Sequence, residues 1–173
     1  MPEHIELNPA SHITVGTVGE PGNRTFYLQG SQGREIISLI IEKAQASMIA
    51  EAVEGLLEDL AKDHPNLVNK PAEADLFTVD VRFRTPEFAL FRVGNLGLGF
   101  NEDTGRVIIV AYELVEEGAE AGMVSFWGSI EQMQGLIKQA RSMVKSGRPI
   151  CGNCGEPINR EGHFCPRRNG HNH

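Results

Sequence analysis

The sequence predicts an α+β fold of antiparallel β-meanders and two amphipathic helices, followed by a C-terminal zinc knuckle. Three observations indicate this fold class. Short runs rich in β-branched and aromatic residues are separated by glycine-rich turns, two longer segments repeat apolar residues every three or four positions, and all 3 cysteines lie close to the C-terminus. With 173 residues, 40% of them hydrophobic, the chain is long enough for one body with its own core, 1–148, and a small tail, 149–173.

The first half of the body reads as three strands and a helix. The strands are expected at 12–18, 25–29 and 35–41, because each is short, β-branched or aromatic, and bounded by turns that contain glycine. From about Glu42 the period changes to three and four, with acidic residues on the opposite side, which indicates a helix with one buried stripe. That helix is expected to end near His64, because a proline follows.

The second half follows the same order after a surface link. Further strands are expected at 76–83, 91–100, 106–115 and 123–127. The last helix begins with the capping-box pair Ser129 and Gln132, and an apolar stripe follows at helical spacing. Basic residues gather near its C-terminal end, where the helix dipole favours cations.

The two halves of the body, 1–65 and 76–148, resemble one another. The hairpin segment 33–37 reads Gly-Arg-Glu-Ile-Ile, and the segment 105–109 reads Gly-Arg-Val-Ile-Ile. Each half then closes with a long amphipathic helix. The pattern predicts a duplicated β-β-β-α unit.

The tail carries the clearest chemical signal of the chain. Cys151 and Cys154 are separated by two residues and followed by glycine, the spacing of a zinc knuckle, and Cys165 supplies a third thiolate. A tetrahedral site needs a fourth ligand, for which His163 and His171 compete. Because four protein ligands lie within reach, we expect a closed structural zinc site in preference to a catalytic one.

Two other interpretations of the cysteines are weaker. A redox Cys-x-x-Cys motif would follow a strand and open a helix, whereas Pro149, Gly155 and Pro157 surround this one. Thiols without a specific role are usually dispersed and buried, and these are clustered in a polar segment.

The charge distribution bears on partners and location. The chain carries a formal charge of -7, and the tail contributes +1 through three arginines against two glutamates, so the body carries -8. An acidic body disfavours nucleic-acid binding, so we expect a protein partner, with single-stranded nucleic acid possible only through the tail. No apolar run is long enough to span a membrane and no signal segment precedes the body, so we expect a cytoplasmic protein.

Two patterns in the second half suggest ligands only weakly. The glycines at 94, 97 and 99 precede a hairpin and another strand, whereas a phosphate-binding loop would precede a helix. Three arginines and three phenylalanines alternate between 82 and 92, and we expect the phenylalanines to lie in the core and the arginines in solvent.

Several segments resemble a known family. The runs 16–19 and 91–94 and, above all, the tail from Gly147 through Cys151-x-x-Cys154 to His163-x-Cys165-Pro resemble the bacterial family of unknown function numbered 3090, over nearly the whole chain. This resemblance implies an intracellular bacterial protein with a metal-binding tail, and it implies no particular activity.

These observations together predict a zinc-binding adaptor or regulatory protein of the cell interior. The alternatives are a metal-dependent or pocket-based enzyme of the hydrolase class, and a protein that binds single-stranded nucleic acid through the zinc knuckle. A metal that keeps a water ligand, in a cleft that gathers Arg92, Glu113 or His12 around it, would favour the enzyme. The sequence leaves the oligomeric state open.

Overall fold

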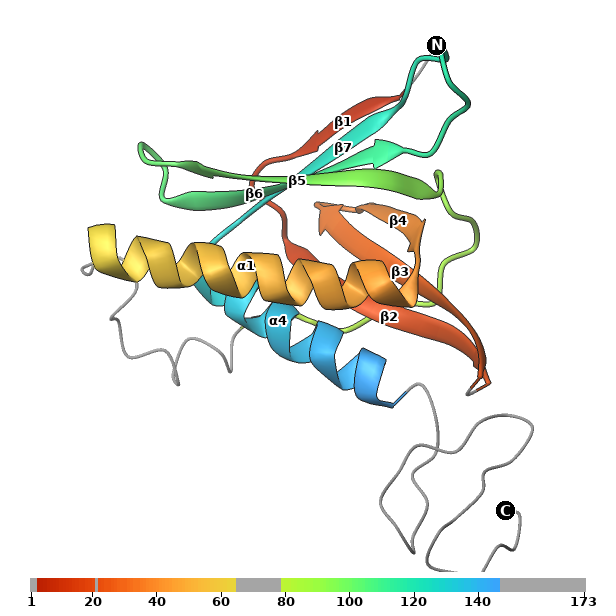
Figure 1. Ribbon diagram of the computed structural model, residues 1–173, viewed down its shortest axis with the longest axis horizontal. Helices are drawn as coiled ribbons and strands as arrows, with labels where there is room; N and C mark the ends of the chain where they lie inside the picture. Colours follow the sequence, from red (N-terminus) through yellow and green to blue (C-terminus); the bar gives the residue numbers. More distant parts are fainter. Residues whose placement is uncertain (1–2, 21, 65–78, 147–173) are drawn as a thin grey trace, which may run out of the picture.

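The computed structural model describes residues 3–20, 22–64 and 79–146, which form two sheets and two helices (Figure 1). The first sheet has the spatial order β1 (His4–Leu7), β7 (Met123–Gly128), β6 (Arg106–Glu113) and β5 (Val93–Asn101). The second has the order β2 (His12–Glu20), β3 (Asn23–Gln32) and β4 (Glu35–Ile41). The helices are α1 (Lys43–Asp63) and α4 (Ile130–Lys145).

The chain order confirms the predicted α+β class and its repeated β-β-β-α unit. The strands β2, β3 and β4 form an antiparallel meander that leads into α1, and β5, β6 and β7 form a second that leads into α4. The two helices are exchanged between the halves. The second helix packs along β2 of the first half, and α1 lines a groove with β5 and β6 of the second half.

The core lies between the sheets and the helices. Along β6, Val107, Ile109 and Ala111 are buried on one face of the sheet, and Ile109 lines a groove with α1. The sheets meet where the ring of Phe126 lies over the backbone of Gly30, and a Cβ atom there would stand 2.5 Å from the ring. Glycine at this position therefore allows the close approach of the two sheets.

Two segments differ from the sequence prediction. The strand β1, which was not predicted, runs parallel to β7 from His4 to Leu7. The segment predicted as a strand at 76–83 forms no strand over its described part, 79–83. Its backbone is held mainly by side chains: the Thr14 hydroxyl donates to the Val81 carbonyl at 2.6 Å, and Gln29 bonds the Arg84 backbone.

The predicted helix ends are confirmed. At the start of α4 the Ser129 hydroxyl accepts from the Gln132 amide at 3.0 Å, and the Gln132 side chain accepts from the Ser129 amide at 2.8 Å. The first helix ends at Asp63, and its C-cap residue His64 donates its backbone N–H to the Leu60 carbonyl. Neither described helix is both long enough and apolar enough to cross a membrane.

Candidate functional site

The predicted zinc ligands lie outside the described residues. Cys151, Cys154, His163, Cys165 and His171 all fall within 147–173, so the zinc knuckle and the body–tail boundary remain predictions. Within 3–20, 22–64 and 79–146, no group of three or more His, Cys, Asp or Glu side chains is placed to hold a metal ion.

The three residues that would favour an enzyme lie in separate places. Arg92 pairs with Glu42 at 2.8 Å at the start of α1. The carboxylate of Glu113 accepts from the Gly122 backbone at 3.0 Å, beyond the end of β6. His12 is buried on β2, on the side of the three-stranded sheet that faces away from the helices. The described residues do not bring these three together, and Arg92 lines a cavity without the other two. Because the predicted metal ligands lie outside the described residues, the enzyme hypothesis stays untested.

His12 belongs to a buried polar network between the three-stranded sheet and the segment 79–90. Its Nδ1 bonds the Ser31 hydroxyl, and its Nε2 lies 3.2 Å from Oε1 of Gln29. The Gln29 amide nitrogen donates to Ser38 Oγ at 3.0 Å and to the Arg84 carbonyl at 2.6 Å, while Oε1 accepts from the Arg84 amide at 3.0 Å. One glutamine thus joins two strands to the covering segment.

The hydrogen bonds define the protonation state of this histidine. Because the Arg84 backbone fixes the orientation of the Gln29 amide, Oε1 faces His12, and the proton must lie on Nε2. Burial lowers the pKa of His12 below its ordinary value of 6.5, the Gln29 bond opposes that shift, and the charge of Arg84 adds to it. A neutral imidazole with both nitrogens bonded holds the fold together and has no free position for a metal or a substrate.

The basic and aromatic alternation between 82 and 92 gives a mixed outcome. Phe91 is buried, and Phe83 packs in a stacked arrangement on Tyr27 with ring centroids 5.8 Å apart. The prediction that all three phenylalanines lie in the core is wrong for Phe88, which is 75% exposed. This residue lies in the segment before β5 and lines a surface pocket beside β4, where its ring stays open to solvent.

One face of the four-stranded sheet carries apolar side chains that are not fully buried. The side of this sheet away from α1 carries apolar side chains in adjacent rows: Ile108 beside Trp127, and Tyr112 beside Met123, with Val110 between them on β6. We call these five residues the outer apolar face. All five stay at least partly exposed, Tyr112 to 39%, because no described helix or loop lies over them.

Glycines make one side of the outer apolar face shallow. On β5, Gly97 is paired with Val110 and Gly99 with Ile108, and an added Cβ atom at either would meet nothing closer than 3.8 Å. Neither glycine is needed to avoid a clash. Their missing side chains instead leave the flanks of Ile108 and Val110 open to a neighbouring surface.

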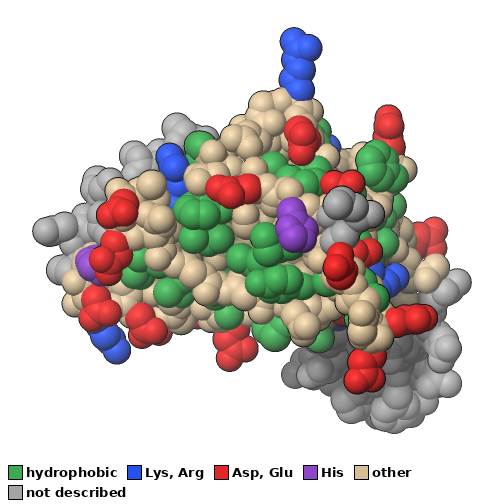
Figure 2. All heavy atoms as spheres, turned by 90° about the horizontal axis from the view of Figure 1, so that it is seen from above, with side chains coloured by type: hydrophobic (Ala, Val, Ile, Leu, Met, Phe, Trp, Pro, Cys, Tyr) green, Lys and Arg blue, Asp and Glu red, His purple; other side chains and the backbone are tan. Residues whose placement is uncertain are grey.

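Acidic residues surround the outer apolar face. Seen from the side of the four-stranded sheet, apolar side chains gather near the middle of the molecule and Asp and Glu side chains lie around them (Figure 2). The sequence places acids at both ends of this sheet and along β1, at Glu102, Asp103, Glu116, Glu117 and Glu6. An apolar centre with a charged rim is the usual composition of a protein interface. This rim is mainly negative, with Arg106 at the start of β6 as a positive exception.

The sequence of β6 contains a local signal for this apolar face. The strand β6 reads Arg-Val-Ile-Ile-Val-Ala-Tyr-Glu, with six consecutive residues that are apolar or aromatic. Such a run is typical of a strand that is covered on both faces, whereas a half-exposed strand alternates.

The fold and its surface define a protein made of two β-β-β-α units with exchanged helices and an open, apolar sheet face. The chain belongs to the family described as "Protein of unknown function (DUF3090)", whose model matches residues 5–165. The predicted family resemblance is thereby confirmed, and the match includes the three cysteines of the tail. Searches of curated proteins and of solved structures find no match to the chain.

Proposed function

We propose that this protein is a zinc-binding adaptor or regulatory protein that holds a protein partner on its outer apolar face. The observation that carries the proposal is the position of Ile108, Val110 and Trp127 on a sheet face that no described element covers. Exposed aromatic and aliphatic side chains in adjacent rows lose water when a partner docks, and aromatic residues often dominate the binding energy of such contacts.

The charge around the face indicates the kind of partner. A second copy of this chain would bring an acidic rim against another acidic rim, and each body carries a charge of -8 by the sequence. A partner with an apolar centre flanked by lysine or arginine would be attracted both at long range and in contact. We therefore expect a different protein with a basic rim, and disfavour nucleic acid at this face.

The tail would form a separate, metal-stabilised unit. Three thiolates with one imidazole, from either His163 or His171, form a donor set that suits zinc. The tail contains little apolar material, so its fold would depend on the metal, which contributes about 10–16 kcal/mol in zinc-finger peptides near neutral pH. The zinc would be structural in this role, and it would present the tail arginines to a partner.

A photo-crosslinker placed on the sheet tests the partner surface. We would replace Tyr112 by benzoylphenylalanine in the cells that make this protein, with Met48 on α1, 49% exposed, as the matched position. We expect a defined protein adduct from position 112 that is absent from position 48, and loss of the adduct when Val110→Lys is added. An adduct with twice the mass of the chain would show that the partner is a second copy of this chain and not a different protein. The same adducts from both positions, or none from 112, would refute the proposal.

Metal analysis tests the zinc separately. We expect about one zinc per chain with three sulfur and one nitrogen ligands by X-ray absorption, and loss of the metal in Cys151→Ser and Cys154→Ser while the melting of the body is unchanged. His163→Ala and His171→Ala would identify the fourth ligand. An oxygen ligand in place of nitrogen would instead favour the metal-dependent hydrolase, and an absence of metal would end the zinc proposal.

A further inference from the structure

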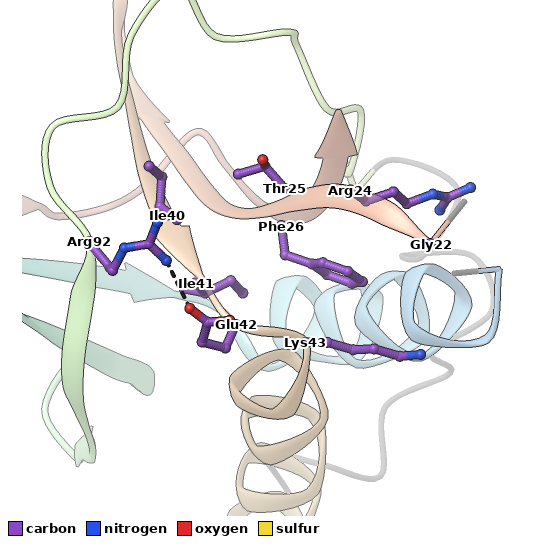
Figure 3. A pocket seen from close by; sticks show the side chains of 9 residues that line it. All are labelled: Gly22, Arg24, Thr25, Phe26, Ile40, Ile41, Glu42, Lys43 and Arg92. Carbon is purple, nitrogen blue, oxygen red and sulfur yellow. Dashed lines mark hydrogen bonds and ion pairs between the residues drawn. The ribbon is translucent and has the colours of Figure 1, made fainter. Parts of the chain in front are cut away.

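A polar cavity of about 480 Å³ lies where the three-stranded sheet meets the start of α1 (Figure 3). Its floor is apolar: Phe26 of β3 and Ile41 of β4, both nearly buried. Charged side chains surround it, and they are Arg24, Glu42, Lys43 and Arg92. It is separate from the outer apolar face, which lies on the other sheet.

The cavity is positive in a body that is strongly negative. It brings together three cations and one carboxylate, although the chain has 23 acidic and 16 basic residues. The carboxylate, Glu42, pairs with Arg92 at 2.8 Å, so one cation is already neutralised. Arg24 and Lys43 have no carboxylate partner among the described residues. Figure 3 shows them extending in the same direction, on either side of the Phe26 ring in this view.

Arg24 shows the shortage of acceptors most clearly. Its Nη1 donates to the hydroxyl oxygens of Thr17 at 3.3 Å and Ser146 at 3.2 Å, both of which are neutral. Its Nε is buried and has no hydrogen-bond partner in the described part of the chain. Several other guanidinium groups pair with carboxylates: Arg141 binds Glu54 through two bonds, and Arg82 and Arg84 bind Asp80. Arg106, like Arg24, donates to a neutral oxygen, that of the Asn8 amide. The charge of Arg24 is therefore not neutralised by a described carboxylate, and it can attract an oxyanion to the cavity beside it.

We propose that this cavity binds a phosphate-type oxyanion, either free phosphate or the phosphate group of a small molecule. Arg24 and Lys43 supply the charge, and the buried Phe26 beside them lowers the local dielectric, which strengthens charge interactions. The N-terminal end of α1 adds little to binding, although helix starts attract anions, because the Glu42 carboxylate already caps it. Glu42 opposes the ligand and limits its affinity.

Titration of the full-length protein with inorganic phosphate and with pyrophosphate, at constant ionic strength and followed by NMR, tests the site. We expect saturable shifts at the amides of Thr25 and Lys43. Removal of one cation, by Arg24→Gln or Lys43→Gln, should weaken binding about three- to tenfold, the range for one partly exposed charge contact. Glu42→Gln should strengthen binding about threefold, because it removes a repelling charge and releases Arg92. Arg141→Gln, on the exposed surface of α4, is the control and should have no effect.

The comparison of Arg24→Gln with Arg141→Gln separates a specific site from general attraction to positive charge, because both substitutions remove one positive charge and only the first removes it from the cavity. If Arg24→Gln behaves like Arg141→Gln, or if Glu42→Gln weakens binding, the proposal is wrong. Shifts that grow linearly without saturation, or that centre away from Thr25 and Lys43, also overturn it. Saturation by pyrophosphate alone would assign the site to a phosphorylated molecule instead of free phosphate, which supports the proposal and narrows its ligand.

Discussion

The network around Gln29 gives the sharpest test of how this fold is held together. We consider the substitution Gln29→Met, which keeps the length of the side chain and removes its hydrogen-bonding groups. Gln29 is fully buried on β3 and makes four hydrogen bonds, two to the Arg84 backbone and one each to His12 and Ser38. Two of these bonds hold the segment 79–90 against the sheet, and the other two hold the polar side chains beneath it.

The expected loss follows from what each partner can do after the substitution. The Nε2–H of His12 is buried and would have no acceptor, at a cost of about 1–3 kcal/mol. The Arg84 backbone is partly accessible and could turn to water, so each of its two lost bonds costs about 0.5–1.5 kcal/mol. Without the bond to Ser38, these losses sum to about 2–6 kcal/mol, a large fraction of the stability of a domain of this size.

Equilibrium unfolding in urea at pH 7.5 would measure this loss, with hydrogen exchange at the Arg84 amide as a local readout. Thr14→Val is the matched control, because it removes one bond from the same segment, to the Val81 carbonyl, at about 1 kcal/mol. We expect faster exchange at Arg84 and a loss of stability well above that of the control. A loss no larger than that of Thr14→Val would show that the segment is held mainly by apolar packing, and our account of the network would fail.

Two further predictions concern the same core. Burial lowers the pKa of His12 in the folded state, with Arg84 and Arg82 adding to the shift and Asp80 opposing it, so the unfolded chain binds the proton more readily. The free energy of unfolding should therefore be at its full value above about pH 6.5 and should decrease as the pH falls below it. Urea titrations from pH 7.5 to 5 would detect this decrease, which should be smaller in His12→Gln. Gly30→Ala would place a Cβ atom 2.5 Å from the Phe126 ring and should lower the free energy of unfolding by about 1–3 kcal/mol. In the control Gly97→Ala the nearest neighbour lies at 4.0 Å, so the free energy of unfolding should change by less than about 0.5 kcal/mol. Equal effects of the two substitutions in thermal melts would contradict the proposed contact between the sheets.

The sequence predicts the local elements of this fold well because those elements depend on local patterns. The turns with glycine, the 3.6-residue period of the helices and the Ser129 capping box each act within a few residues. The parallel pairing of β1 with β7 and the packing of α4 on β2 depend on contacts between residues more than 100 positions apart, which no local pattern encodes. The segment at 79–83 misled the prediction because it alternates like a strand, and yet side chains of β2 and β3 hold its backbone.

The candidate sites also differ in whether a local sequence pattern could predict them. The zinc ligands are named by their spacing alone, since a metal requires particular residue types at short separation. Phosphate-binding capacity at Arg24 and Lys43 has no such signal, because the two residues come from different elements and are joined only by the fold. The outer apolar face lies between these cases: the unbroken apolar run of β6 was a local signal, but which of its faces would stay open depends on where α1 packs.

The repeated unit makes the open face more informative than an apolar patch on an arbitrary surface. Each half supplies a sheet with one side turned to the core and one side turned away. In the three-stranded sheet the side turned away is polar, at His12, Thr14 and Gln29, and the chain covers it with the segment 79–90. In the four-stranded sheet the corresponding side is apolar, and no described segment covers it. An apolar face benefits more from cover than a polar one, which supports our proposal of a protein partner there and is the reason to place the crosslinker at Tyr112 first.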